Sequence, residues 1–312
     1  LHYIVIMFAV LFPGQGSQSV GMAKLLYDKY PLVKSIFSKA DEVLDFPISN
    51  LILNGPSQDL NLTENTQPAI FIVSYSIFSL IQSKSNIDLN KANYFAGHSL
   101  GEYSALSCAK SVNFESALKL LKKRGKFMQD AVPLAYGGMM AVLGIKINDL
   151  ETIIKDNNFE NCQIANDNCP GQIVVSGKKS SMVELSVFLK MKSIKCINLN
   201  ASGPFHSKFM ANATRAMQVE IDKIDFNLPN PQIISNISAS VKKDVQEIKK
   251  SLVDQIEGRV RWRETIECMT SKGVKKFIEI GPGKVLTGLI KRIDKSLEII
   301  TINNDEDINN LK

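Results

Sequence analysis

Hydrophobic residues along the first part of the chain follow two alternating patterns. Short, wholly apolar runs are typical of buried strands, and apolar residues that recur every three to four positions are typical of amphipathic helices. The strands predicted in this way cover 8–12 and 94–96, and the helices lie within 17–44, 67–81, 100–109 and 115–131. Strands that alternate with helices favour an α/β fold in which helices connect parallel strands.

A different order of elements occupies the middle of the chain, between Gly137-Gly138 and Gly203-Pro204. Strand, helix, strand, strand, helix and strand follow one another there, which is the order of a ferredoxin-like unit. The strands are predicted at 139–145, 162–166, 172–176 and 194–199, and the helices at 148–157 and 180–191. Because glycine and proline stand at both ends, we predict an inserted subdomain over 137–203 within a discontinuous larger domain of 1–136 and 204–312.

The first pattern resumes after the insertion. Helical periodicity spans 207–221, 245–256 and 263–271 and begins again at Lys284, while apolar runs predict strands at 232–235 and 276–280. No internal repeat is visible, and the only tract of low complexity is the polar tail over 303–312.

The composition narrows the class of protein. Of 312 residues, 45% are hydrophobic and 22% are charged, as in a globular chain with a large core. The longest apolar run, 3–12, has about half of the ~20 residues that a membrane helix needs, so no membrane span is expected. Five cysteines without a C-x-x-C pair argue against disulfides and thiolate metal sites and favour a reducing compartment, the cytoplasm.

The N-terminus carries no cationic segment followed by a small-residue cleavage site, so we predict no signal peptide. Met7 directly precedes the first predicted strand and is a candidate natural start. Leu1 to Ile6 then stand outside the predicted fold.

The strongest chemical signal is Gly97-His98-Ser99-Leu100-Gly101, which matches G-x-S-x-G. In such a turn a strand bends sharply into a helix and exposes the serine as a nucleophile. Glycine is needed because the bend leaves no room for a Cβ on either side of the serine. Since a predicted strand precedes the motif and a predicted helix follows it, Ser99 is the candidate nucleophile. The alternative is an ordinary glycine-rich turn between a strand and a helix.

A nucleophilic serine needs a base, and histidine is the usual one. The chain has three histidines. His2 lies in the N-terminal extension, and His98 adjoins Ser99, so its side chain should leave the bend in another direction. His206 remains as the candidate base, in the loop Gly203-Pro204-Phe205-His206 where the predicted insertion ends, and loops commonly hold catalytic groups.

Arginine is rare, with six Arg against 31 Lys, and one of the six stands in an unusual place. In the helix predicted over 115–131, apolar residues form one face and four lysines form the opposite face, but Arg124 falls in the middle of the apolar face. An unpaired buried ion is costly. Two explanations stand: a buried ion pair with an unidentified Asp or Glu, or a guanidinium that binds the carboxylate or phosphate of a substrate.

Two glycine-rich loops match nucleotide-binding motifs only in part. Phe12-Pro13-Gly14-Gln15-Gly16-Ser17-Gln18 follows the first strand, but Ser19 stands where a dinucleotide-binding loop has its third glycine. Gly281-Pro282-Gly283-Lys284 lacks the spacing of a P-loop and is expected to be a tight turn. The first loop can still direct backbone N–H groups toward a developing oxyanion.

Together these residues resemble the malonyl-CoA:acyl carrier protein transacylase family of fatty acid synthesis. Seven motifs match in order over nearly the whole chain. They are FPGQGSQ at 12–18, TQPAI at 66–70, GHSLGEYSAL at 97–106, RGKFMQ at 124–129, PGQIVVSG at 170–177, GPFHS at 203–207 and EIGPGKVLTGL at 279–289. The resemblance implies an α/β-hydrolase-like domain interrupted by a ferredoxin-like subdomain. It also implies no cofactor, because the thioesters of CoA and phosphopantetheine are substrates.

The resemblance implies a role for each matching residue. Ser99 would attack malonyl-CoA, and His206 would act first as base and then as acid. Arg124 would bind the malonyl carboxylate. The backbone N–H groups of Gln15 and Leu100 would form the oxyanion hole, so the catalytic pair is a serine and a histidine without an acidic third member.

Two further positions follow from the same resemblance. Gln255, seven residues before Trp262 as in the family, would orient His206 through its backbone carbonyl. Phe205 resembles malonyl-selective members, in which bulk before the histidine disfavours a 2-methyl branch. One departure is Gly258-Arg259, where many members have Asn-Pro.

The net charge of +6 suits an acidic partner. Acyl carrier proteins are strongly acidic, so the resemblance implies malonyl-CoA and an acyl carrier protein as partners of a monomer. Nucleic acid is not expected, because no nucleic-acid-binding motif is present and aromatic residues do not interleave with basic ones. The runner-up enzyme is a serine thioesterase or carboxylesterase, which would share the serine turn but leave the charged pocket unexplained.

Overall fold

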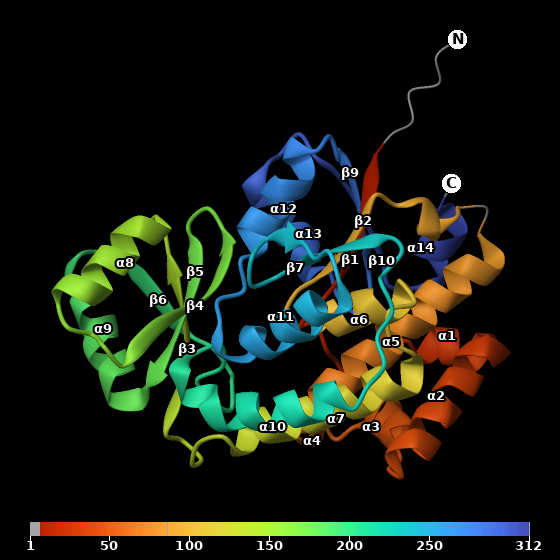
Figure 1. Cartoon of the computed structure of the whole chain (residues 1–312), viewed down its shortest axis with the longest axis horizontal. Helices are drawn as coiled ribbons and strands as arrows, with labels where there is room; N and C mark the ends of the chain where they lie inside the picture. Colours follow the sequence, from red (N-terminus) through yellow and green to blue (C-terminus); the bar gives the residue numbers. More distant parts are fainter. Residues whose placement is uncertain (1–6, 86, 312) are drawn as a thin grey trace.

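The computed structural model describes residues 7–85 and 87–311, and in it the chain forms two sheets (Figure 1). The larger sheet has the strand order β10-β9-β1-β2-β7-β8, and the smaller one has the order β4-β5-β3-β6. The mixed α/β class with a second, smaller sheet is therefore confirmed. The exact domain boundaries stay a prediction, and Leu1 to Ile6, with His2, lie outside the described residues.

The larger sheet is parallel except at one edge. Its strands are β1 (Phe8–Phe12), β2 (Tyr94–Gly97), β7 (Gln232–Ser235), β8 (Ser240–Val241), β9 (Lys276–Ile280) and β10 (Glu298–Ile302). β1 pairs in parallel with β2 and β9, and only β8 runs antiparallel to its neighbour β7. Because parallel strands end at the same edge, the loops that follow β1, β2 and β7 meet there.

Helices cover both faces of this sheet because side chains alternate along β1. Val10 and Phe12 face one core cluster, and Ala9 and Leu11 face another. The first cluster draws on α2 (Pro31–Leu44), α5 (Thr63–Lys84), α6 (Gly101–Cys108), α7 (Phe114–Asp130), α10 (Ala211–Asp222) and α11 (Val245–Glu257). The second draws on α12 (Trp262–Ser271) and α13 (Val285–Ile293). Short helices complete the larger part: α1 (Lys24–Lys29), α3 (Ile48–Asn54), α4 (Ser57–Leu60), η1 (Leu89–Lys91) and η2 (Lys208–Met210).

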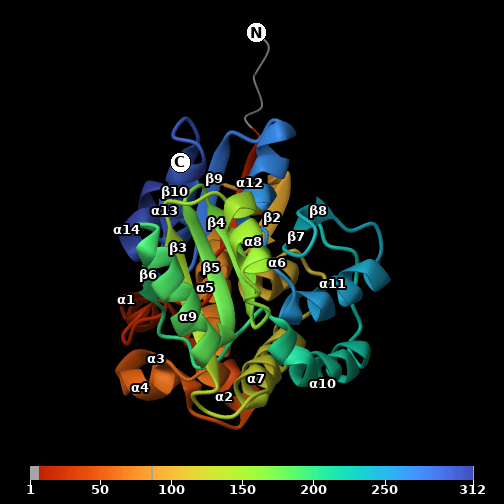
Figure 2. The same cartoon turned by 90° about the vertical axis from the view of Figure 1, so that its left-hand side faces the viewer.

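The smaller sheet is antiparallel throughout and has its own core. It consists of β3 (Gly137–Leu143), β4 (Cys162–Cys169), β5 (Gln172–Lys178) and β6 (Lys195–Asn198). The helices α8 (Ile147–Asp156) and α9 (Lys179–Met191) lie on its outer side, as seen in Figure 2. The chain order strand, helix, strand, strand, helix, strand agrees with the expected ferredoxin-like order. Among the described residues, the inner face of the smaller sheet carries no helix of its own and faces the larger part of the chain.

The two parts are joined by backbone hydrogen bonds as well as by the chain itself. Asp167 N donates to Val260 O at 2.9 Å, and Val260 N donates to Ala165 O at 2.8 Å. These bonds join β4 to Val260, in the segment that follows α11.

The C-terminal region differs from the prediction. The polar tail over 303–312 contains a helix that was not predicted, α14 (Asp305–Asn310), and the edge strand before it, β10, was not predicted either. Asn304 caps α14 by accepting a hydrogen bond from Asp307 N, and Ile308 is buried. A local cap and one buried side chain stabilise a helix too short for a periodic signal.

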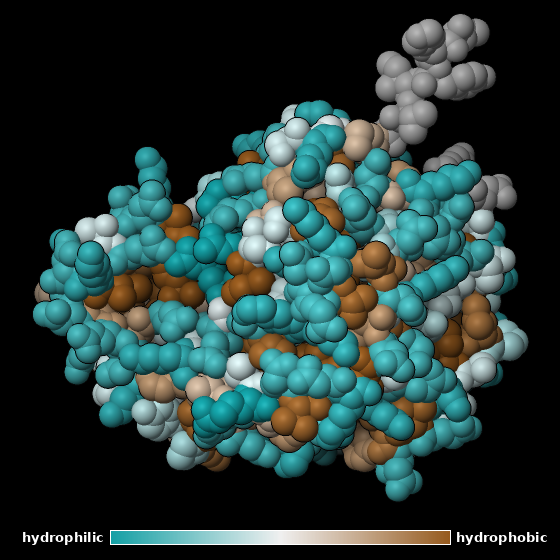
Figure 3. All heavy atoms as spheres, viewed as in Figure 1, coloured by the Kyte–Doolittle hydropathy of each residue, from teal (hydrophilic) through white to brown (hydrophobic). Residues whose placement is uncertain are grey.

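The surface is mostly polar. On the face shown in Figure 3, hydrophilic residues dominate and hydrophobic ones occur in separate small groups. Within 7–85 and 87–311, no helix is both long and apolar enough to cross a membrane.

Candidate active site

Ser99 stands at the bend between β2 and α6, at the carboxyl edge of the larger sheet. Its φ of 52° is rare for a residue with a side chain. A Cβ on Gly97 would lie 1.9 Å from the backbone of Gly101, and one on Gly101 would lie 2.3 Å from Phe12 O. Only glycine fits at either position, which is the physical reason for the G-x-S-x-G spacing.

Asn236, directly after β7, holds the bend in place. Its Oδ1 accepts from Ser99 N at 2.7 Å, and its Nδ2 donates to Gly97 O at 2.7 Å. Its own backbone N donates to Glu102 Oε2 at 3.1 Å. Asn236 was not among the residues predicted from the sequence. The only sequence signal that could have indicated Asn236 is its position directly after a predicted strand, because such strands end at the carboxyl edge of the sheet.

His206 lies directly beside Ser99. Its Nε2 lies 2.8 Å from Ser99 Oγ, and its Nδ1 lies 2.7 Å from Gln255 O. A carbonyl can only accept, so Nδ1 carries the proton and Nε2 is left to accept one from the serine. Burial, and then the charge of Arg124, lower the pKa of His206 to about 3, so the ring is neutral at pH 7.

Arg124 extends from α7 toward the same serine. Its Nη2 donates to Ser99 Oγ at 3.2 Å. Its other partners are Gln67 and Gln255, and among the described residues no carboxylate forms an ion pair with it. Its Nε is buried and has no hydrogen-bond partner in that part of the chain. Of the two explanations for a buried arginine, the structure does not support the first, a direct ion pair with an Asp or Glu among the described residues.

Glu102 lies behind this arginine, on α6. Gln255 Nε2 donates to Glu102 Oε2 at 2.7 Å, so the glutamine separates the acid from the guanidinium. Burial raises the pKa of Glu102 to about 7, against hydrogen bonds from Asn236 and Gln255 that lower it. Burial also lowers the pKa of Arg124 from its ordinary value.

A cavity of about 390 Å³ opens onto these groups. It is lined on one side by the larger domain and on the other by β3 and β5 of the smaller sheet, through Met139, Ala141 and Val174. Five of the six predicted site residues line it: Gln15, Ser99, Leu100, Arg124 and His206. The sixth, Gln255, is fully buried behind His206. Leu100 is the N-cap of α6, so its N–H belongs to a helix N-terminus beside the serine.

His98 points away from the serine, as expected from the geometry of the turn. Its Nε2 lies 2.8 Å from Asn168 Oδ1, and its ring packs 5.5 Å from that of Trp262. Burial lowers the pKa of His98. Among the described residues, the histidine that contacts Ser99 Oγ is His206 and not His98.

The described residues contain neither a candidate metal site nor a disulfide. Over 7–85 and 87–311 no group of three or more His, Cys, Asp or Glu side chains is arranged to hold a metal ion. All five cysteines are free thiols.

The chain is similar to known proteins over nearly its whole length. A family model described as "Acyl transferase domain" matches residues 9–307. A malonyl CoA-acyl carrier protein transacylase of Bacillus subtilis is 41% identical over 303 residues, which cover 96% of this chain and 94% of the relative. The chain belongs to the malonyl CoA-acyl carrier protein transacylase family.

Solved structures of the family agree closely with this fold. An acyl-carrier-protein-S-malonyltransferase from Bartonella henselae superposes with a TM-score of 0.94 at 38% identity, covering 97% of this chain and 98% of the other. A malonyl-transacylase in complex with its type II PKS acyl-carrier protein superposes with a TM-score of 0.93 at 36% identity, covering 97% of both chains.

Proposed function

We propose that this chain transfers a malonyl group from malonyl-CoA to the phosphopantetheine thiol of an acyl carrier protein, in support of type II fatty acid synthesis. One observation carries the proposal. Ser99 Oγ lies 2.8 Å from a neutral histidine and 3.2 Å from a buried arginine that has no acidic partner among the described residues. A nucleophile, a base and an unpaired cation within one cavity suit an acyl group that carries a carboxylate.

In the first half-reaction, Ser99 Oγ attacks the thioester carbonyl while His206 Nε2 takes the hydroxyl proton. The backbone N–H groups of Gln15 and Leu100 are proposed to stabilise the oxyanion. The C–S bond then breaks, His206 protonates the departing thiolate, and a malonyl ester remains on Ser99. Gln255 O keeps the ring oriented by accepting from Nδ1 throughout.

In the second half-reaction the thiol of the carrier protein attacks the ester. His206 takes the thiol proton and returns it to Ser99 Oγ as the ester bond breaks. Arg124 holds the carboxylate through both steps, so the acyl group stays oriented while the two thiols exchange. No cofactor is needed, because both thioesters are substrates.

The proposal extends to partners and setting. The excess of basic residues favours encounter with an acidic carrier protein. We propose a monomer, as the resemblance to the family implies, and the cytoplasm, because the five cysteines are free thiols.

Intact-mass spectrometry after incubation with malonyl-CoA tests the mechanism. We expect a single malonyl adduct that disappears on addition of an acyl carrier protein with its phosphopantetheine, and no adduct on Ser99→Ala. A malonyl adduct that persists on Ser99→Ala contradicts the nucleophile. Release of free malonate faster than transfer to the carrier protein would instead support the serine thioesterase.

A further inference from the structure

Two glutamines hold the guanidinium of Arg124. Its Nη1 donates to Gln67 Oε1 at 2.8 Å, and its Nη2 donates to Gln255 Oε1 at 2.8 Å. All three side chains are at most 1% exposed. An amide oxygen accepts a hydrogen bond but carries no full charge, so the two bonds fix the direction of the guanidinium without cancelling its charge.

The two glutamines differ in what else they contact. Gln255 also donates to Ser99 O and Glu102 Oε2, and its backbone orients His206. Gln67 Nε2 lies 3.7 Å from the sulfur of Met128, which is a weak acceptor. Arg124 is therefore the main polar partner that the structure gives Gln67, and Gln67 also lines the cavity.

The close packing of α5 against α7 explains why Gln67 reaches Arg124. A Cβ on Gly125 would lie 2.5 Å from Thr63 O and 2.6 Å from Glu64 Cα. Only glycine permits this approach, which brings the residue next to it, Arg124, against the side chain one turn along α5.

We propose that Gln67 is a positioning residue that sets the preference of this site for acyl groups with a carboxylate. It aims the guanidinium at the acyl group on Ser99, and because it is neutral the guanidinium charge is left for the substrate. The inference rests on the malonyl transfer proposed above. A glutamate at this position would have the same length but would supply the counter-ion from within the protein.

The test compares Gln67→Glu with the wild-type protein on malonyl-CoA and acetyl-CoA. We expect kcat/KM for malonyl-CoA to fall about 30- to 100-fold, mostly through KM, because a carboxylate already pairs with Arg124. Acetyl-CoA should change by less than about threefold, since it makes no ion pair. Gln58→Glu, on the exposed surface of α4, adds the same charge away from the cavity and should leave both substrates unaffected.

Two further variants separate positioning from folding. Gln67→Met keeps the length but replaces the amide oxygen with a sulfur that accepts only weakly, so malonyl transfer should fall about tenfold, less than in Gln67→Glu. In an Arg124→Ala background, Gln67→Met should not change the malonyl-to-acetyl ratio further, because Gln67 acts through Arg124 and the replacement adds no charge to the cavity.

The proposal is overturned if Gln67→Glu keeps the wild-type ratio of malonyl to acetyl transfer, or if it lowers both equally. A further change of that ratio by Gln67→Met in the Arg124→Ala background would overturn it as well. If the wild-type protein forms no malonyl ester with malonyl-CoA, the proposed function itself is wrong. Intact-mass spectrometry detects that outcome separately from the ratio of malonyl to acetyl transfer.

Discussion

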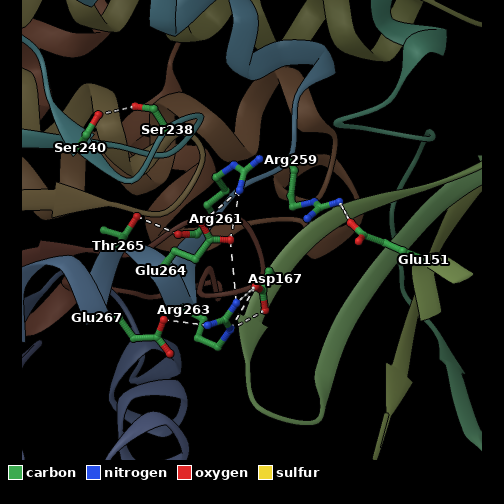
Figure 4. A network of polar contacts seen from close by, with 10 residues as sticks. All are labelled: Glu151, Asp167, Ser238, Ser240, Arg259, Arg261, Arg263, Glu264, Thr265 and Glu267. Atoms are coloured by element: carbon green, nitrogen blue, oxygen red, sulfur yellow. Dashed lines mark hydrogen bonds and ion pairs between the residues drawn. The ribbon is translucent and has the colours of Figure 1, made fainter. Parts of the chain in front are cut away.

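Arg124 and three arginines elsewhere in this molecule differ in the side chains that compensate their charges. Arg124, in the cavity, is held by the neutral side chains of two glutamines and a serine. At the junction of the two sheets, Arg259, Arg261 and Arg263 form what we call the junction cluster, and each has a carboxylate partner (Figure 4). The same residue type therefore serves two purposes, which its neighbours distinguish.

Arg263 shows the structural use most clearly. Its Nη2 donates to Asp167 Oδ2 at 2.7 Å and its Nη1 donates to Glu267 Oε2 at 2.7 Å. Asp167 lies on β4 and is almost fully buried, so this pair joins the smaller sheet to α12. This contrast supports the proposal that Arg124, which has no direct acidic partner among the described residues, binds the carboxylate of the substrate.

The largest effect is expected at Arg124. Arg124→Ala should lower kcat/KM for malonyl-CoA about 1000-fold, because a buried ion pair with the substrate is lost, while acetyl transfer is retained or raised. Arg124→Lys should recover only part of this, since the planar fork is lost. Steady-state kinetics with both thioesters measure the difference. Unchanged malonyl kinetics in Arg124→Ala would mean that this arginine does not bind the carboxylate.

Arg263→Ala should have the opposite profile. The free energy of unfolding should fall by about 2–3 kcal/mol, because Asp167 is left buried without its partner. Urea denaturation measures that loss. The malonyl-to-acetyl ratio should stay within about twofold of wild type, since Arg263 does not line the cavity. A change in selectivity as large as that of Arg124→Ala would remove the distinction between the two groups.

A moderate effect is expected on the pH dependence of Ser99 reactivity, measured with a serine-directed fluorophosphonate. Because the pKa of His206 is lowered to about 3, the rate should show no inflection near the ordinary value of 6.5. In Arg124→Ala one cause of the lowering is gone, so the acid-side inflection should move to higher pH. A wild-type inflection near 6.5 would contradict a neutral, buried base.

The same shift affects stability. The folded state does not take up the His206 proton until far below 6.5, whereas the unfolded chain does. Unfolding free energy should therefore fall as the pH drops below about 6.5, and the reactivity measurement is best confined to pH values where the protein stays folded.

The last prediction concerns only the pH dependence of stability and involves Glu102, the acid that Gln255 separates from Arg124. Its pKa rises from 4.5 in the unfolded chain to about 7, so its contribution to stability is complete below 4.5 and is lost as the pH rises through 7. Glu102→Gln should reduce the difference in unfolding free energy between pH 5 and pH 8 by up to about 3 kcal/mol. Glu184→Gln, on an exposed face of α9, is the control. Equal pH dependence in wild type and Glu102→Gln would show that Glu102 is not held protonated.

The sequence by itself determined the elements with strong local patterns. The strands 8–12, 232–235 and 276–280 were predicted with the bounds that the structure has. Ser99 was recognisable because two glycines must flank it, and Arg124 because a charge interrupts an apolar face. Each of these signals is carried by residues within one or two helical turns, so no knowledge of distant contacts was needed.

Only the tertiary structure decided which polar residues surround these two. Asn236 stands in no motif, and the motif that contains Gln67, TQPAI, does not indicate which residue Gln67 contacts. Both reach the site because β7 and α5 pack beside β2 and α7. That Arg124 pairs with amides, while Arg263 pairs with acids, likewise depends on contacts between segments far apart in the chain. Charge compensation acts through space, and a one-dimensional pattern does not record it.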